Sequence, residues 1–122
     1  MIYAVNRNLG DDTELPDIVL AAYAGDVEMV AKILAAGGDP NSVDPRDNLS
    51  LLHIACLQGD ERLADLLLQR AKEKCDLDFS IRSRSRPRLA WQYAANANHL
   101  ELAERVHEAS LTPQAQRAYL LE

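Results

Sequence analysis

The sequence is poor in aromatic residues and has no long apolar run. Only 5% of its 122 residues are Phe, Trp or Tyr, whereas 48% are apolar, mostly Ala and Leu. Small side chains of this kind suit thin helical layers that pack closely together. Charged residues interrupt every apolar stretch before it reaches the roughly 18 residues of a membrane-spanning helix, so we expect no membrane span.

Cysteine is scarce, and no export signal is visible. Cys56 and Cys75 show no spacing typical of a disulfide framework. Residues 1–5 lack the basic start and the long apolar stretch of a signal peptide. These features predict a cytoplasmic protein in a reducing compartment. We interpret Cys56 as a small apolar residue in a helix interface and Cys75 as an incidental thiol.

Motifs for metal, cofactor and phosphate binding are missing. His53, His99 and His107 occur without Cys-x-x-Cys or His-Glu-x-x-His spacing, so we predict no metal site. The glycines fall at predicted corners, caps or a leading turn, not in a phosphate-binding loop. We therefore expect no cofactor. An enzyme hypothesis would rest on His53 and Cys56, which could share one helical face, but we expect both to serve structure.

What the sequence does contain is a repeated pattern. Pairs of small residues lie four and three positions before Gly25 and before Gly59, and these glycines are 34 residues apart. A third copy has Ala94 and Ala95 before Asn98, which follows Gly59 by 39 residues. Three copies at such a period indicate a solenoid of stacked units.

The second copy carries the motif by which the pattern resembles the ankyrin repeat. Residues 50–55 read Ser-Leu-Leu-His-Ile-Ala, against the family signature T-P-L-H-x-A, with Leu51 in place of the proline. Residues 25–41 resemble the second helix and exit turn of the family. The resemblance covers residues 13–109 and implies an all-α ankyrin-repeat α-solenoid of three helix pairs with projecting turns. The third copy lacks the hydroxyl cap and the histidine, so we expect it to be the least regular.

We predict a single ankyrin-repeat domain over residues 1–122. It comprises a leading segment (1–12), three repeats (13–46, 47–85 and 86–110) and a C-terminal capping helix (111–122). Helices are expected near 13–24, 27–36, 50–58, 61–74, 89–97 and 99–109, with a brief extended segment at 76–81.

Individual residues support these helix limits. Thr13 is the expected N-cap of the first helix, with Pro16 in its first turn. Thr112 followed by Pro113 is a favoured helix start and opens the capping helix. Leu100 is expected on the buried face of the sixth helix.

The net charge of −6 is unevenly distributed. Residues 1–47 hold nine acidic and three basic residues, and the remainder holds ten of each. Four arginines crowd between positions 82 and 88. A basic turn of this kind suits a carboxylate-rich protein patch, whereas the acidic first half and the lack of interleaved aromatic residues argue against nucleic acid.

The resemblance also implies a binding surface, because ankyrin arrays bind proteins with their finger tips and with the exposed side of the first helices. Tyr23 and Leu57 are the leading contact residues, since stability alone would not explain their exposure there. Trp91 is either a core residue or a partner anchor. The predicted partner-binding residues are Tyr23, Arg46, Asp47, Leu49, Leu57, Gln58, Arg82, Arg84, Arg86, Arg88, Trp91 and Asn96.

A compact array without a second domain has little to offer except its surface. We therefore expect a non-catalytic protein-binding module, monomeric alone or in a hetero-complex, that inhibits or sequesters a partner protein such as a toxin or an enzyme. An immunity-type inhibitor of a toxin is a special case, which rests on analogy. The alternatives are a self-assembling structural or scaffold subunit and a phosphate or nucleic-acid binder that uses the arginine-rich turn.

Overall fold

The computed structural model describes residues 15–74, 76–84 and 87–111, and these residues form three consecutive helix pairs. The pairs are α1 (Asp17–Tyr23) with α2 (Val27–Ala35), α3 (Leu51–Gln58) with α4 (Glu61–Lys74), and α5 (Ala90–Asn96) with α6 (Leu100–Ser110). Two short strands, β2 (Val43–Asp44) and β3 (Leu49–Ser50), precede the second pair. The predicted all-α solenoid of three helix pairs is confirmed.

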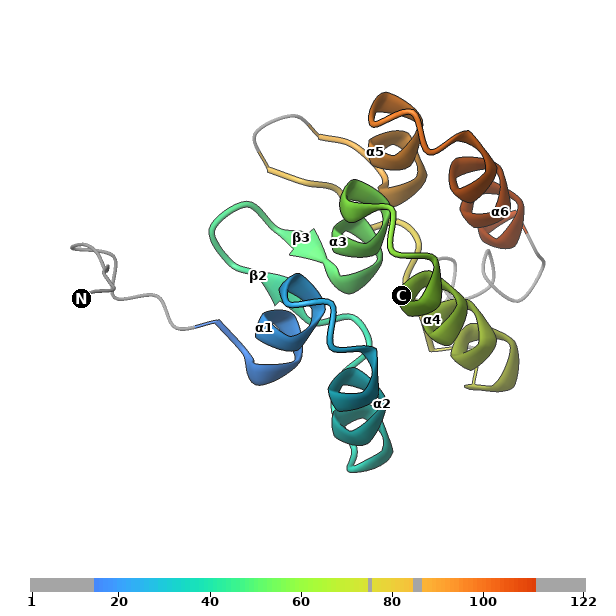
Figure 1. Ribbon diagram of the computed structural model, residues 1–122. Helices are drawn as coiled ribbons and strands as arrows, with labels where there is room; N and C mark the ends of the chain where they lie inside the picture. Colours follow the sequence, from blue (N-terminus) through green and yellow to red (C-terminus); the bar gives the residue numbers. More distant parts are fainter. Residues whose placement is uncertain (1–14, 75, 85–86, 112–122) are drawn as a thin grey trace.

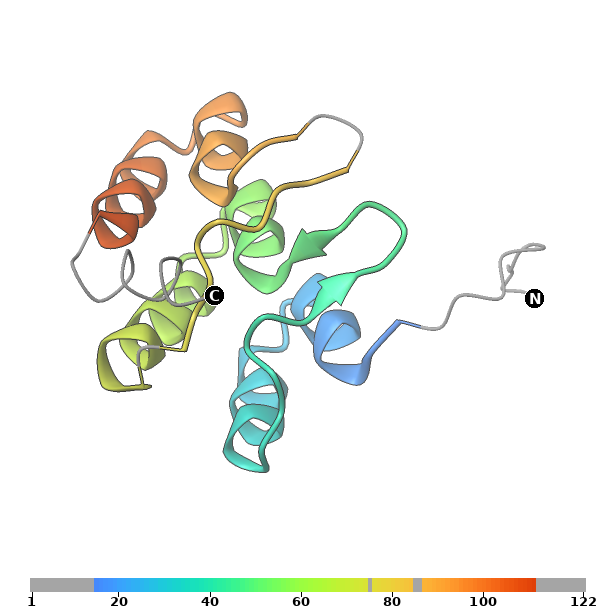
Figure 2. The same cartoon turned by 180° about the vertical axis from the view of Figure 1, so that it is seen from behind.

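The pairs stack side by side in two layers (Figure 1). Helices α1, α3 and α5 form the first layer, helices α2, α4 and α6 form the second, and neighbours within each layer are in contact. The view from behind shows the same order, with the long connections running from the second layer back to the first (Figure 2). Each pair therefore covers the apolar side of the next.

The corner inside each helix pair is a residue in the left-handed backbone region. Gly25, Gly59 and Asn98 have φ angles of 73°, 69° and 67°. Asparagine fills the third corner because its short polar side chain tolerates this region better than most side chains do. The three residues that define the repeat in the sequence thus share one backbone geometry.

Side-chain hydrogen bonds fix the start of α3. The Ser50 hydroxyl accepts from the His53 backbone N–H at 3.2 Å, and the Ser50 N–H donates to His53 Nδ1 at 3.3 Å. In the third pair, Leu89 offers no side-chain acceptor, but its N–H donates to Gln92 Oε1 at 2.8 Å. The third repeat therefore keeps half of the capping arrangement, with Gln92 in the histidine slot.

The core lies between the layers and between neighbouring pairs. Every residue from 51 to 56 in α3 is buried, because α3 has a helix pair on each side. The second layer adds Leu63, Ala64 and Leu67 from α4. Small residues at the contact slots let the backbones approach closely, which agrees with the low aromatic content.

Two details of the helices differ from the sequence-based expectation. Helix α1 begins at Asp17, so Pro16 precedes the helix instead of lying in its first turn. Leu100 is 63% exposed, because the buried face of α6 is formed by Leu102, Ala103 and Val106. The expected burial of Leu100 was therefore wrong, and Leu102 contributes to the buried face instead.

Other expectations fall on the connections and the ends. The described residues between 76 and 81 form no strand, although Leu77 and Phe79 are buried as their alternation predicts. The leading segment, the Thr13 cap and the helix expected after Thr112 lie outside the described residues.

Candidate protein-binding surface

Two connections project as fingers beyond the first layer of helices, and both extend on the same side (Figure 1). In the first finger, residues 39–50, strand β2 pairs antiparallel with β3, with Asp44 opposite Leu49. Its turn closes at Asn48, which has φ 57° and donates its N–H to the Asp44 carbonyl at 2.7 Å. The second finger comprises residues 76–89.

A buried carboxylate organises the base of the first finger. Asp44 is 3% exposed. Its oxygens accept from Arg46 Nε at 3.0 Å and Arg46 Nη2 at 2.8 Å, and from the Tyr23 hydroxyl at 2.6 Å. Tyr23 lies in α1, so these bonds join the first repeat to the finger that enters the second. Arg46 is thereby held in one orientation while about half of its side chain, 51%, remains exposed.

The same contacts shift the pKa values of the three groups. Burial alone raises the pKa of Asp44, but hydrogen bonds from Arg46 and Tyr23 outweigh it and lower the pKa to about 2. The hydrogen bond to Asp44 raises the pKa of Arg46 further above its ordinary value. Burial, reinforced by the bond to Asp44, raises the pKa of Tyr23 to about 12. Asp44 and Arg46 are thus a fixed ion pair at neutral pH.

The tips of the two fingers are joined by hydrogen bonds. The Arg84 N–H donates to the Asp47 carbonyl at 2.8 Å, and Arg84 Nη1 donates to the Pro45 carbonyl at 3.1 Å. Asn48 Nδ2 donates to the Arg82 carbonyl at 2.8 Å. Residues 45–48 and 82–84 therefore form one continuous surface, which we call the finger-tip surface.

The first helices present a second part of the predicted site. Tyr23, Leu57 and Asn96 occupy the same slot, two residues before each corner. Leu57 is 44% exposed, although it directly follows six buried residues. Gln58 is exposed, and its Nε2 donates to the Tyr23 carbonyl at 3.0 Å, so it also links α3 to α1. Asn96 is exposed at the end of α5.

The structure removes Leu49 from the predicted site. Leu49 is only 8% exposed because β3 turns its side chain into the core, so the expectation of an exposed contact residue there was wrong. Arg88 is half-buried, and its carbonyl accepts from His53 Nε2 at 2.8 Å. Tyr23 is also half-buried and has a structural role through Asp44. Arg86 lies outside the described residues.

Trp91 lies in α5, in the third repeat. It is half-buried, and its ring packs against the imidazole of His107 with centroids 4.4 Å apart. Packing between α5 and α6 therefore accounts for part of its surface. The exposed remainder is compatible with the predicted role of partner anchor, which stays a prediction.

His53 and Cys56 are engaged in structure. Besides the Ser50 cap, His53 spans to the next repeat through its bond to residue 88, and Tyr93 packs edge-on against it at 5.4 Å. The geometry fits a neutral imidazole with the proton on Nε2, and burial lowers the pKa of His53. Burial raises the pKa of the Cys56 thiol to about 12, which disfavours the nucleophilic thiolate. The pair has the features of a packed helix interface.

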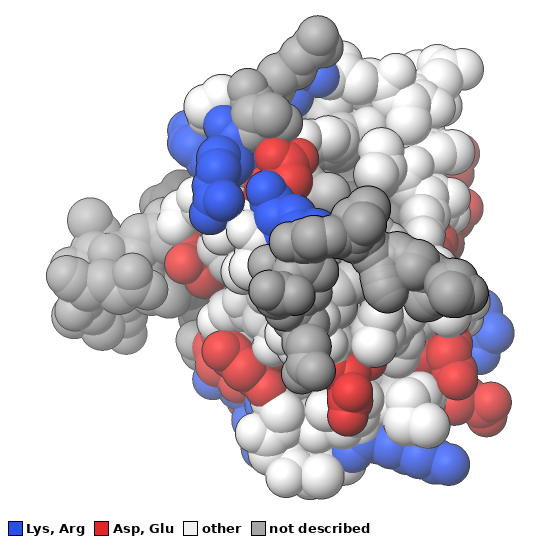
Figure 3. Space-filling model, turned by 90° about the vertical axis from the view of Figure 1, so that its left-hand side faces the viewer, with Lys and Arg blue, Asp and Glu red and all other residues white. Residues whose placement is uncertain are grey.

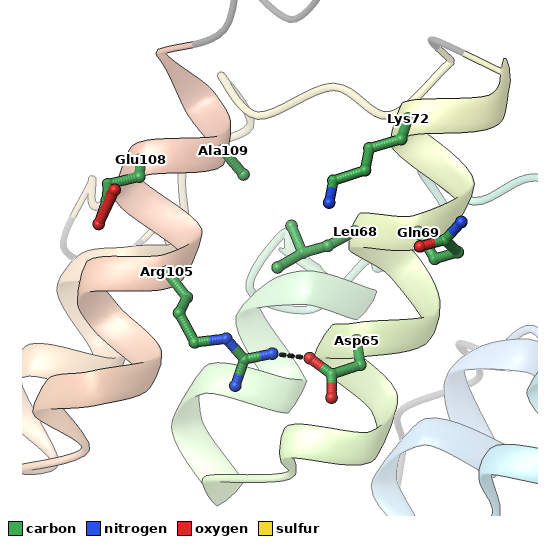
Figure 4. A pocket seen from close by; sticks show the side chains of 7 residues that line it. All are labelled: Asp65, Leu68, Gln69, Lys72, Arg105, Glu108 and Ala109. Atoms are coloured by element: carbon green, nitrogen blue, oxygen red, sulfur yellow. Dashed lines mark ion pairs between the residues drawn. The ribbon is translucent and has the colours of Figure 1, made fainter.

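A groove of about 450 Å³ lies on the opposite layer, between α4 and α6 (Figure 4). Its lining residues are Asp65, Leu68, Gln69, Lys72, Arg105, Glu108 and Ala109. Arg105 reaches across it to form ion pairs with Asp65 and, at 3.2 Å, with Glu61. Five of these seven lining residues are polar or charged, whereas ligand pockets are mostly lined by apolar side chains. We interpret this groove as a junction between two second-layer helices.

Comparison with known protein families matches residues 18–115 to three ankyrin repeats. The chain belongs to the ankyrin-repeat family. The match covers most of the chain and agrees with the three corners, the Ser50 cap and the two layers. Ankyrin repeats are protein–protein interaction modules.

A curated relative is the Nuclear factor NF-kappa-B p105 subunit of Gallus gallus. It is 33% identical over 73 residues, which is 60% of this chain but only 7% of the relative. The chain thus spans less than a tenth of the length of that protein. The likeness supports the ankyrin array and carries no further function.

The described residues were also compared with what a metal site and a membrane-spanning helix require. Within the described residues, no group of three or more His, Cys, Asp or Glu side chains is arranged to hold a metal ion. None of the described helices has the length and apolar character needed to cross a membrane.

The sequence did not reveal which polar side chains form hydrogen bonds between distant segments of the ankyrin array. Asn41 Nδ2 donates to the Asp76 carbonyl at 2.8 Å, and Asn41 Oδ1 accepts from the Asp78 N–H at 2.7 Å. Asp44 makes a corresponding bond with Tyr23 at the base of the first finger, and Asn48 bonds to the Arg82 carbonyl at the finger tips. In the sequence all of these look like ordinary polar turn residues, because their partners lie 21 to 37 residues away along the chain.

Proposed function

We propose that this ankyrin array binds a partner protein with the finger-tip surface and with the exposed first-helix residues Leu57, Gln58 and Asn96. The observation that supports the proposal most is Leu57. It lies in the central repeat, 44% exposed, at the end of a helix whose preceding six residues are all buried. An exposed leucine in the central repeat is suited to the apolar contact of an interface.

We further propose that the array acts by covering a functional surface of its partner, as an immunity-type inhibitor of a toxin would. Rigidity supports this mode of action. The finger tips are joined by a backbone and two side-chain hydrogen bonds, and Arg46 is fixed by Asp44. A surface that is ordered before binding loses less conformational entropy on association, so a small array can bind tightly. A cytoplasmic location for this interaction remains a prediction.

The experiment compares two substitutions of matched exposure. Leu57→Arg changes the first layer, and Met29→Arg changes α2 in the second layer, where Met29 is 43% exposed. Tagged wild-type protein and both variants are purified from the source cells, and the bound proteins are quantified. Circular dichroism and urea denaturation verify that both variants fold.

We expect one protein to accompany the wild type at near-equal molar amount, to persist with Met29→Arg and to be lost with Leu57→Arg. The activity of that protein is then measured with and without the array, and inhibition is expected. Equal recovery with Leu57→Arg would overturn the proposed role of the first helices in binding. An active partner in the saturated complex would overturn inhibition while leaving binding intact.

A further inference from the structure

We propose that the finger-tip surface binds an acidic segment of the partner, whose Asp or Glu carboxylates contact Arg46, Arg82 and Arg84. This inference rests on the proposed function, because it assigns a chemistry to the protein bound there. The two fingers differ in how their positive charges are balanced.

The first finger supplies its own counter-ion. Asp44 is buried beneath Arg46 and accepts two guanidinium hydrogen bonds, so this pair is close to neutral. The remaining exposed half of Arg46 can donate to a second acceptor, because a guanidinium carries five N–H donors.

Among its described residues, the second finger has no buried carboxylate at the position that corresponds to Asp44. Ser83 follows Asp44 by 39 residues, the same interval that separates Leu89 from Ser50, and it is 2% exposed and uncharged. The flanking Arg82 and Arg84 are both exposed. Neither forms an ion pair with another described residue. The buried carboxylate of one repeat is thus replaced by a serine in the next, while arginines stand on either side of it.

The fingers bring these charges together. Arg84 Nη1 lies 3.1 Å from the carbonyl of Pro45, the residue next to Arg46 in the chain. Two guanidinium groups therefore border the same short turn, and only Arg46 has a buried partner. A carboxylate bound at this turn can accept from both guanidinium groups, because its two oxygens offer several acceptor sites. Planar guanidinium groups also match the geometry of a carboxylate.

The surface view supports a local basic site on an acidic protein. Figure 3 faces the side on which the fingers project, and Lys and Arg side chains gather in its upper part with acidic atoms between them. The whole chain carries a net charge of −6. Acidic groups elsewhere would repel a long polyanion such as a nucleic acid, whereas a short acidic segment can contact the finger tips alone.

The test uses a peptide of consecutive glutamates as the probe. Its affinity is measured by calorimetric or fluorescence titration at low and physiological salt. The proteins are wild type, Arg82→Gln, Arg84→Gln and the control Arg62→Gln, which removes the same charge from an exposed position on α4. Arg82→Gln removes no side-chain hydrogen bond to a described residue, so its folding is expected to be intact. The matching glutamine peptide and a single-stranded DNA of equal charge are titrated in parallel.

We expect Arg82→Gln and Arg84→Gln each to weaken glutamate-peptide binding about tenfold, Arg62→Gln to leave it unchanged, and the glutamine peptide not to bind. Equal effects of Arg62→Gln and Arg84→Gln would overturn the site, since the attraction would then depend on net charge. Tighter binding of the DNA than of the peptide would overturn the choice of a protein carboxylate.

Failure of this inference is distinguishable from failure of the proposed function. Loss of the partner with Leu57→Arg but not with Arg82→Gln or Arg84→Gln would leave the protein-binding surface standing and remove its acidic specificity. The reverse result would keep the arginine site and remove Leu57 from the interface.

Discussion

Substitution of the buried carboxylate at the finger base, Asp44→Asn, is the sharpest test of how the fingers are held. Asp44 joins α1 to the first finger through Tyr23 and fixes Arg46 at the finger tips. Asparagine has nearly the same shape but no charge. Any change in stability therefore reports the interaction of that charge with its two donors.

The expected magnitude follows from the pKa of Asp44. A fall from the ordinary value of 3.8 to about 2 means that the folded state favours the carboxylate by about 2 kcal/mol at neutral pH. Because the folded-state pKa is the lower one, this stabilisation is fully present above pH 4–5 and is lost as the pH falls through 3.8 towards 2. At pH 3 about half of it, roughly 1 kcal/mol, should remain.

The assay is urea denaturation followed by circular dichroism at pH 7, 5 and 3. We expect Asp44→Asn to lower the free energy of unfolding by about 2 kcal/mol at pH 7 and at pH 5, and by about half as much at pH 3. Glu104→Gln, at an exposed position on α6, is the control and should change stability by less than about 0.5 kcal/mol at each pH.

The reasoning would be refuted by a loss at pH 7 that is as small as that of Glu104→Gln. A loss that does not shrink between pH 5 and pH 3 would refute it too, because the effect would then come from shape and not from charge. Tyr23→Phe removes one of the two donors to Asp44, so we expect it to lower the free energy of unfolding by a smaller amount, about 1 kcal/mol.

Three further predictions concern the repeat framework. His53→Ala should lower the free energy of unfolding by about 3 kcal/mol, since it leaves a cavity and removes the ring hydrogen bonds; a loss below about 1 kcal/mol in urea denaturation would contradict this. Gly59→Ala should be more destabilising than Gly25→Ala, because both glycines have positive φ but only at Gly59 would a Cβ lie 2.6 Å from the His99 ring; equal losses in the same assay would contradict this. The Cys56 thiol, with its pKa raised to about 12 by burial, should resist alkylation at pH 8 until urea unfolds the protein, so rapid labelling of the folded chain would disprove its burial.

Helices, caps and corners could be predicted where the residues that determine them lie close together in the chain. The α3 cap at Ser50, the limits of α4 at 61–74 and the three corner residues all follow from short patterns of sequence. Leu100 shows the limit of this approach. Its spacing fits an apolar face, but the neighbouring helices cover Leu102 and Val106 instead.

The candidate site could be predicted only in outline. The resemblance pointed to the finger tips and first helices, and it included Leu57, Arg46 and Arg84, which are exposed. It also included Leu49, which is buried, and it treated Tyr23 as a contact residue when its hydroxyl serves Asp44. Nothing in the local sequence separates a turn residue that faces solvent from one that bonds to another repeat.

The sequence by itself determined the repeat, its helices and its corners, because helix caps, apolar periodicity and left-handed turns depend on residues only a few positions apart. The tertiary structure alone decided which polar residues join the repeats and which charges remain exposed. Asp44 meets Tyr23 from a position 21 residues away, and Asn48 meets residue 82 from 34 away. Contacts of this kind exist only once the helix pairs are stacked, since stacking sets the distance between neighbouring fingers.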